Sequence, residues 1–265
     1  MSLDLNNELK LTIDMGIVLL PNKECKDLSN SITNFVATSL PKASQITNKP
    51  HITLIHIANQ DNKGAATLKE TFVNFYHNNT PSVIKLPNRS LDPKDLIKAT
   101  GGNSEIGYKW MDMDFHVTPA LKELRNQVTT TFCPLHQGVL TRMNDNENNF
   151  IEGSQAKKDI DECGVTFTNY TPHITTWYVD IPKENKVKEL NDIASSITPK
   201  VPHAECYAEH IALVELGRNG QATKIIESFP LSQETSNTTI APVISTITIV
   251  FLVAYLVFRY NKKKK

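Results

Sequence analysis

The chain has 265 residues, of which 40% are hydrophobic and 21% are charged. This length and composition allow a substantial core, and they exclude a wholly disordered chain, a collagen-like repeat and a multi-span membrane protein. The 28 basic and 28 acidic residues balance, but five of the basic residues follow Thr239, which leaves residues 1–239 with 23 basic and 28 acidic residues. A body with a net charge of about −5 does not favour long duplex nucleic acid, which is bound by neutralising many phosphates.

Hydrophobic spacing divides the body into helices and strands. In chain order we expect a strand at 11–20, a helix at 24–40, a strand at 51–57, a helix at 65–78, strands at 82–86 and 105–115, a helix at 119–132, a strand at 173–179, a helix at 183–197, and strands at 205–216 and 222–230. The polar, Asn-rich stretch within 133–169 is predicted to be a loop inserted between two halves. Strands and helices mixed in this order indicate an α+β fold.

The two ends of the chain differ from this body. Residues 1–10 are polar and lack the basic and apolar runs of a signal peptide, so we expect a flexible N-terminus before a domain at 11–231. Residues 240–258 contain no charge, and as a helix they would span roughly 28 Å, about the thickness of a bilayer core. We predict a single C-terminal transmembrane helix between a polar linker at 232–239 and a basic tail at 259–265.

The side of the membrane on which the body lies depends on two further features. Four widely spaced cysteines, Cys25, Cys133, Cys163 and Cys206, form no Cys-x-x-Cys pair, so we expect free thiols in a reducing compartment. The basic tail favours the cytosol, but translocating a short tail is a smaller task than translocating the body. We therefore predict a tail-anchored protein with its body in the cytosol.

One tetrapeptide, Pro-His-Ile-Thr, occurs twice, at residues 50–53 and 172–175, and each copy opens an apolar strand. Side chains alternate along a strand, so His51 and Thr53 share one face, as do His173 and Thr175. Chance predicts about one His-x-Ser/Thr among eight histidines. That chance match is His116-Val117-Thr118, where Thr118 precedes a proline and a helix, so we interpret it as a helix N-cap.

Two histidines and two threonines suit the cleavage of a phosphoester. One neutral imidazole, of His51 or His173, can accept a proton while the other, protonated, donates one to the leaving oxygen. The hydroxyls of Thr53 and Thr175 can donate hydrogen bonds to the phosphate oxygens. We expect no cofactor and no metal, because a metal site needs three or more ligands and the strands that bear these motifs place no carboxylate beside either histidine.

Paired His-x-Thr motifs on strands resemble those of the two-histidine (2H) phosphoesterase superfamily, in particular its 2′-5′ RNA ligase and cyclic phosphodiesterase branch. The similarity covers about residues 11–231 and includes the final hairpin at 210–231. It implies two pseudo-symmetric lobes, each an antiparallel sheet with helices outside, around a central cleft that carries both motifs. It also implies metal-independent action on 2′,3′-cyclic phosphates, 2′-5′ linkages or RNA 3′ ends.

Four other residues are candidates for substrate contacts. Lys49 and Tyr170 precede the two histidines by two and three residues, and could reach a phosphate or a base. Tyr108 and Trp110 alternate on one predicted strand and could stack a nucleobase. Each of the four also has an ordinary explanation, as a surface lysine or a core aromatic residue.

Two classes of function remain open at this stage. A hydrolase would turn over cyclic or 2′-5′-linked nucleotides as a monomer. A membrane-tethered binding protein would hold a nucleotide or phosphate without turnover. The intact histidines and threonines of both motifs favour the enzyme.

Overall fold

The computed structural model describes residues 12–39, 49–88, 98–100, 110–138, 140, 154–165, 170–178, 204–217 and 220–232. The predicted N-terminus at 1–10, helix at 183–197, transmembrane helix at 240–258 and basic tail at 259–265 lie outside these residues. Within the part of the chain that the structure describes, no helix is long and apolar enough to cross a membrane.

Three predicted helices are confirmed within a few residues at each end: α1, Lys23–Ser39; α2, Asn62–Asn79; and α4, Pro119–Phe132. Short polar side chains accept backbone hydrogen bonds at their starts, and two of these bonds are at most 3.2 Å long. The carboxylate of Asp61 accepts a hydrogen bond from the backbone N–H of Gly64 at 2.8 Å. The hydroxyl of Thr118 accepts one from Leu121 N–H at 3.2 Å, with proline at the first helical position. Thr118 is therefore the N-cap that its sequence predicts.

The strands form two sheets in which all neighbouring strands are antiparallel. The larger sheet has the order β2-β1-β7-β3, and β8 also pairs with β7. Its members are β1, Ile13–Pro21; β2, Ile52–Gln60; β3, Ile84–Lys85; β7, Tyr207–Leu216; and β8, Ala222–Pro230. The smaller sheet has the order β4-β5-β6, with β4, Lys98–Thr100; β5, Trp110–Asp114; and β6, His173–Tyr178. The α+β class is thus confirmed, and each His-x-Thr motif lies on its own antiparallel sheet.

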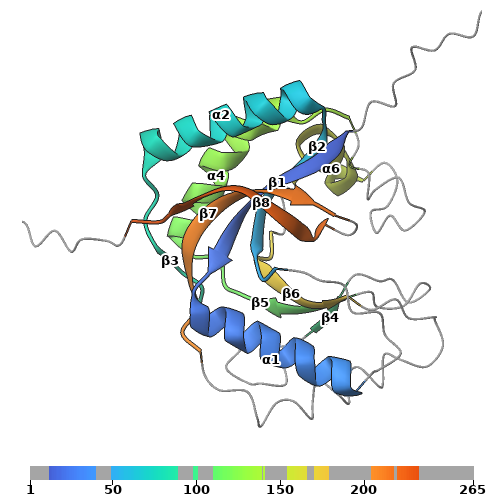
Figure 1. Cartoon of the computed structure of the whole chain (residues 1–265), viewed down its shortest axis with the longest axis vertical. Helices are drawn as coiled ribbons and strands as arrows, with labels where there is room; N and C mark the ends of the chain where they lie inside the picture. The colour runs from blue at the N-terminus through green and yellow to red at the C-terminus, as the bar shows by residue number, and fades with distance from the viewer. Residues whose placement is uncertain are drawn as a thin grey trace, which may run out of the picture. The chain divides into compact units, whose positions relative to one another are not determined.

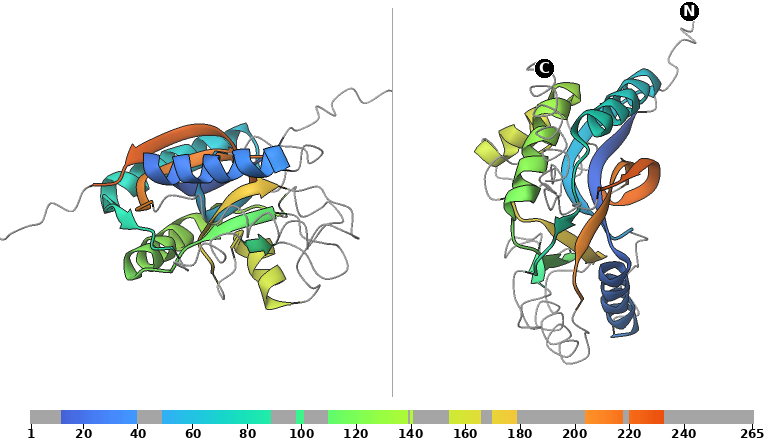
Figure 2. Two further views of the ribbon diagram at one scale, coloured as in Figure 1. Left: turned by 90° about the horizontal axis from the view of Figure 1, so that it is seen from below. Right: turned by 90° about the vertical axis from the view of Figure 1, so that its left-hand side faces the viewer.

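The two halves of the sequence are interwoven in the fold. The C-terminal hairpin β7–β8 joins the sheet of the first motif, because β7 pairs along β1. Helix α1, which follows β1, packs against β6 of the other sheet, and Thr33 donates a hydrogen bond to the carbonyl of Thr176 at 2.6 Å. Helix α4 packs on β2. Figure 1 shows α1 in the lower part of the view, α2 along the top and α4 below α2, with strands of both sheets between α1 and α2, and Figure 2 shows the same elements from two other sides.

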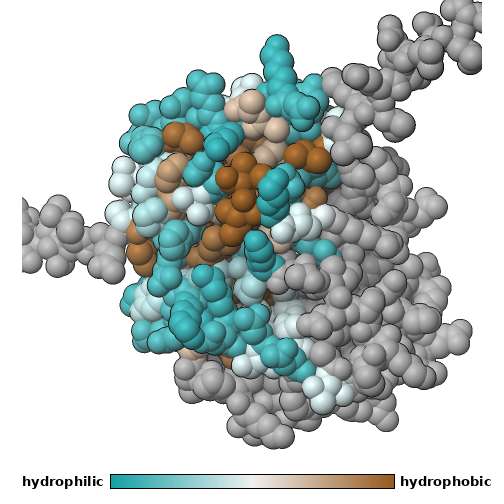
Figure 3. Space-filling view, in the orientation of Figure 1, coloured by the Kyte–Doolittle hydropathy of each residue, from teal (hydrophilic) through white to brown (hydrophobic). Residues whose placement is uncertain are grey.

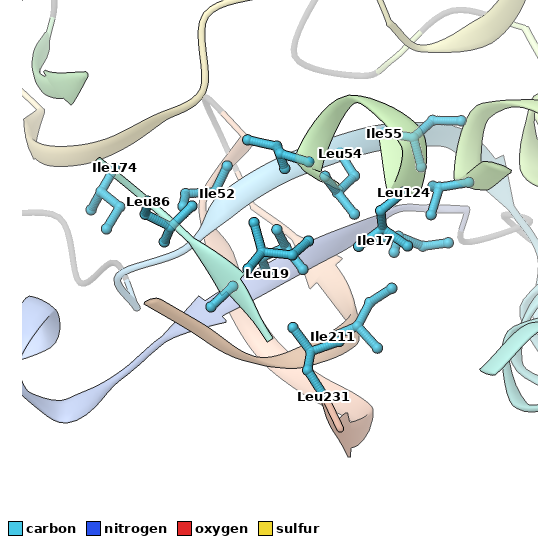
Figure 4. Close-up of a cluster of buried hydrophobic side chains, with 14 of the residues drawn as sticks. Ile17, Leu19, Ile52, Leu54, Ile55, Leu86, Leu124, Ile174, Ile211 and Leu231 are labelled. Atoms are coloured by element: carbon cyan, nitrogen blue, oxygen red, sulfur yellow. The ribbon is translucent and has the colours of Figure 1, made fainter. Parts of the chain in front are cut away.

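One hydrophobic core runs through both sheets (Figure 4). Strand β2 is buried on both faces, since Ile52, Leu54 and Ile55 are all at most 1% exposed. Ile174, between the histidine and threonine of the second motif, is fully buried in the same cluster. Each motif is therefore anchored by its central isoleucine. The outward face of α1 is polar, as the hydrophilic side chains in the lower part of Figure 3 show.

The insert at 133–169 is not simply a loop, so this part of the prediction is wrong. It contains a 3-10 turn, Cys133–Leu135, and helix α6, Gln155–Cys163. The helix ends at Gly164, whose φ of 70° lies in the left-handed region that glycine adopts without strain. Its sequence, QAKKDIDEC, has few apolar residues, so apolar spacing gave little sign of this nine-residue helix. Strand β4 was missed as well, because three residues are too few to show a pattern.

The expectation of four free thiols is also contradicted, because all four cysteines are paired. Cys25 of α1 bonds Cys206, with Cα atoms 5.0 Å apart and a sequence separation of 181. Cys133 bonds Cys163, with Cα atoms 4.7 Å apart. Spacing along the chain could not reveal the first pair, because the fold brings α1 and the segment before β7 together.

Candidate active site

The two His-x-Thr motifs begin the strands β2 and β6. His51 directly precedes β2, and His173 is the first residue of β6. These strands belong to different sheets but contact each other. The charges of His51 and His173 are close enough to interact. The fold thus brings together the two motifs that the sequence places 122 residues apart.

Both imidazoles are held in the same way. Nδ1 of His51 lies 2.7 Å from the carbonyl oxygen of Lys49, and Nδ1 of His173 lies 2.8 Å from that of Thr171. Only a protonated ring nitrogen can donate to a carbonyl, so this contact places the proton on Nδ1 in each neutral ring. In each histidine Nε2 is then the nitrogen that can accept or donate a proton in a reaction. The two copies of the tetrapeptide thus place their histidines in the same backbone contact.

The surroundings of the two histidines differ. His51 is buried, with 5% of its surface exposed, whereas His173 is half-buried. Burial lowers the pKa of His51 to about 4, assisted by the charge of His173, although backbone hydrogen bonds at Lys49 and Gly220 favour the charged form. His51 is therefore neutral at pH 7. Gly220 lies in the turn of the β7–β8 hairpin, so the C-terminal hairpin completes the surroundings of the first motif.

Tyr170 links the two motifs. Its hydroxyl donates a hydrogen bond to the carbonyl oxygen of Thr53 at 3.0 Å. The guanidinium of Arg125 lies over its ring, 4.0 Å from the ring centre. Burial raises the pKa of the Tyr170 phenol, an effect that Arg125 partly offsets, so the hydroxyl keeps its proton at neutral pH. The structure thus gives Tyr170 a bracing role, in addition to the substrate contact that its sequence position suggests.

Two carboxylates lie beside the second motif, on the neighbouring strand β5; the motif-bearing strands themselves carry none, as the sequence indicates. Asp114 pairs with His173 across β5 and β6, and Asp112 pairs with Thr175. Thr175 donates a hydrogen bond to Asp112 at 2.8 Å. Asp112 and Asp114 are 3% and 8% exposed. They were missed because they belong to a neighbouring strand, although their alternation in Trp110–Asp114 signals a shared face.

This hydrogen bond changes the expectation for Thr175. A hydroxyl has one proton, and that of Thr175 is directed at Asp112. Donation to a phosphate would require the hydroxyl to turn away from Asp112. The half-buried Thr53 pairs with Val18, an apolar residue, so its neighbour across the strands offers no such acceptor. The two His-x-Thr motifs therefore have similar backbone contacts, but only the second has a carboxylate beside its threonine.

The other candidates are placed as follows. The side chain of Lys49 is exposed, and its carbonyl is the acceptor for His51. Trp110 is the first residue of β5 and pairs with Tyr178. Tyr108 lies outside the described residues. His116, the histidine of the chance match, is exposed.

No protein-family model matches the sequence, and no curated protein is significantly similar to it. Solved structures do resemble the chain. TT0787 of Thermus thermophilus aligns with 13% identity and a TM-score of 0.47 over 84% of this chain and 100% of that one, and a phosphoesterase gives the same values. E. coli LigT complexed with 3′-AMP aligns with 12% identity and a TM-score of 0.46, also over 84% and 100%. The chain thus has structural relatives of low sequence identity, and its function is argued from its own residues.

Proposed function

We propose that this protein is a two-histidine phosphodiesterase that hydrolyses 2′,3′-cyclic phosphates or 2′-5′-linked nucleotides. The observation that carries the proposal is the matched pair of imidazoles on two contacting strands. Each Nδ1 is held by the carbonyl two residues earlier, which makes Nε2 the nitrogen that exchanges a proton in each ring; at His51 the backbone of Gly220 also hydrogen-bonds the charged ring. General acid–base catalysis needs two such groups on opposite sides of the scissile bond.

The different surroundings of the histidines suggest their roles. In hydrolysis of a 2′,3′-cyclic phosphate, water attacks phosphorus while Nε2 of His51 takes the proton of that water. A new P–O bond forms, the bond from phosphorus to one ribose oxygen breaks, and His173 gives a proton to that oxygen. His51 suits the role of base because it is neutral at pH 7. Thr53 donates to a phosphate oxygen, and Thr175 does so once its hydroxyl turns from Asp112.

Turnover of a panel of cyclic and 2′-5′-linked nucleotides by the full chain in detergent, with chelator present, tests this proposal. His51→Ala and His173→Ala should each lower turnover by about 10²- to 10⁴-fold, the typical contribution of a positioned acid or base. His116→Ala is the matched control, because it removes an exposed histidine that also precedes a threonine by two positions. Wild-type rates in both motif variants, or equal damage from His116→Ala, would contradict the assignment.

The same assay separates the enzyme from a protein that only binds nucleotides. A binding protein would retain affinity for a nucleotide without any turnover. A requirement for an added divalent metal would contradict metal-independent acid–base catalysis.

We further propose that residues 240–258 anchor the body to a membrane, because they form an uncharged apolar stretch of spanning length. The cytosolic location predicted from sequence rested on the smaller task of translocating a short tail and, in addition, on free cysteines, which the structure pairs. Disulfides favour an oxidising compartment, and the basic tail at 259–265 favours the cytosol. We therefore propose that the body lies on the side opposite the cytosol. Protease added to sealed membranes should leave the body intact, and its digestion would support the original cytosolic prediction.

A further inference from the structure

We propose that Asp112, Asp114 and His173 form a binding site for a divalent transition metal such as Zn²⁺, and that occupation of this site inhibits the enzyme. One ligand atom from each residue lies within 4.8 Å of the other two. Two carboxylates and one imidazole are a donor set that zinc accepts, with a fourth position left for water. The inhibitory part of this inference rests on the proposed phosphodiesterase function.

The strand pairing fixes the positions of the three ligands. Asp112 and Asp114 are two residues apart on β5, so their side chains share one face. Asp114 lies directly opposite His173, and Asp112 lies opposite Thr175. Ligand atoms around a tetrahedral zinc ion are about 3.4 Å apart, given bonds of about 2.0–2.1 Å. Rotation of the side chains can close the remaining distance while the strands stay in register.

The hydrogen bonds around the cluster match those around metal ligands. A histidine that binds a metal through one ring nitrogen usually donates a hydrogen bond from the other to a carbonyl or carboxylate. Nδ1 of His173 has such a contact with the carbonyl of Thr171 at 2.8 Å, which leaves Nε2 to face the ion. Ligand carboxylates are themselves usually hydrogen-bonded, and Asp112 accepts from Thr175 at 2.8 Å. These contacts are a second observation, separate from the distances within the cluster.

Occupation of the site would stop the reaction. The nitrogen that binds the ion is the one proposed to donate a proton to the leaving oxygen, and a metal-bound nitrogen has no proton to give. His51 lies outside the cluster and belongs to the other sheet. The two histidines therefore differ in metal binding as well as in burial.

Isothermal calorimetry of Zn²⁺ with the metal-stripped, untagged full chain in detergent tests the site without an activity assay. We expect one tight site, weakened by more than about 100-fold in Asp112→Asn, Asp114→Asn and His173→Ala, since loss of even an outer partner costs about 10- to 100-fold. Two controls should keep wild-type affinity. His51→Ala removes the other motif histidine, and Asp27→Asn removes an exposed carboxylate on α1. Circular dichroism verifies that each variant is folded.

A turnover assay with the same samples tests inhibition. Equimolar Zn²⁺ should abolish most turnover of the stripped wild-type protein, chelator should restore it, and millimolar Mg²⁺, which prefers oxygen ligands, should have no effect. The site would be refuted by absence of tight Zn²⁺ binding, or by binding that survives all three ligand variants. Tight binding that leaves turnover unchanged, or raises it, would refute inhibition. A stripped protein that binds Zn²⁺ at this site but has no turnover would refute the proposed function and leave the metal site established.

Discussion

The hydroxyl of Tyr170 donates a hydrogen bond to the backbone carbonyl of Thr53 at 3.0 Å, which joins the two His-x-Thr motifs. Tyr170 lies three residues before His173, and Thr53 lies two residues after His51. The bond therefore fixes the separation of the motifs. Proton transfer on both sides of one bond requires that separation to be kept within a fraction of an ångström.

Tyr170→Phe should lower both stability and turnover. Loss of the hydroxyl leaves the Thr53 carbonyl without this donor, at a cost of about 1–2 kcal/mol in the free energy of unfolding. Turnover should fall about tenfold because the spacing of the motifs relaxes. Tyr76→Phe is the control, since its hydroxyl donates to the Pro230 carbonyl at 2.7 Å on the outside of the fold. Urea unfolding and turnover are measured for both variants, and equal turnover in the two would contradict the bracing role.

The pH dependence of turnover should be bell-shaped, with an unusually low acidic limb. A base must be unprotonated, and burial lowers the pKa of His51 to about 4, compared with an ordinary value of 6.5. Turnover should therefore rise as pH increases through about 4 and should already be near its plateau at pH 6. An acidic limb near pH 6.5 would contradict the assignment of His51 as the base.

The same buried histidine predicts how stability depends on pH. Unfolding returns the pKa of His51 from about 4 to about 6.5, so the unfolded chain binds more protons between these values. Stability is therefore fully present above pH 6.5 and falls as pH decreases toward 4, by about 3 kcal/mol from this group. His51→Gln removes the titration, and urea unfolding at pH 7 and pH 4 should show a smaller loss in the variant. Equal losses in the two proteins would mean that His51 is accessible to water.

The candidate site residues could be named from sequence, because a repeated tetrapeptide at the start of two apolar strands is a local signal; their catalytic roles stay a prediction. His51, Thr53, His173 and Thr175 needed no knowledge of the fold. Asp112 and Asp114 could not be assigned, because which strand lies beside β6 is a long-range property. The hydrogen bond of Tyr170 to Thr53 was hidden for the same reason, since the two lie 117 positions apart in the sequence.

For the fold too, local elements could be predicted from sequence and long-range pairing could not. Helices α1, α2 and α4 were predicted within a few residues because each has a regular apolar face and two have recognisable caps. The sequence does not show that the two sheets mix both halves of the chain. Strands β7 and β8, from the C-terminal half, belong to the same sheet as β1. The pairing of Cys25 with Cys206 depends on that arrangement.

Gly164 should tolerate no side chain. A Cβ atom there would lie 1.6 Å from the carbonyl oxygen of His56, and the φ of 70° is already unfavourable for other residues. Gly164→Ala should destabilise the protein by about 2–5 kcal/mol, from backbone strain and overpacking. Asn adopts positive φ more readily than Ala, so a purely conformational cost would make Gly164→Asn clearly milder. Because the His56 carbonyl blocks any Cβ, we expect Gly164→Ala and Gly164→Asn to lose similar stability in thermal unfolding. A near-neutral Gly164→Asn variant would contradict the close approach of Gly164 to this carbonyl.

The paired cysteines can be tested by counting thiols in the purified full chain. Denatured protein kept from reductant should show no thiol that reacts with Ellman's reagent, and reduction should release four. Each bond limits the unfolded chain, and the chain-entropy model gives about 3–5 kcal/mol for loops of 30 and 181 residues. Cys133→Ser/Cys163→Ser and Cys25→Ser/Cys206→Ser should each lower the midpoint of urea unfolding, with the larger decrease for the longer loop. Four reactive thiols before reduction would show that the cysteines are free, as the sequence analysis expected. That result would support a body in the cytosol.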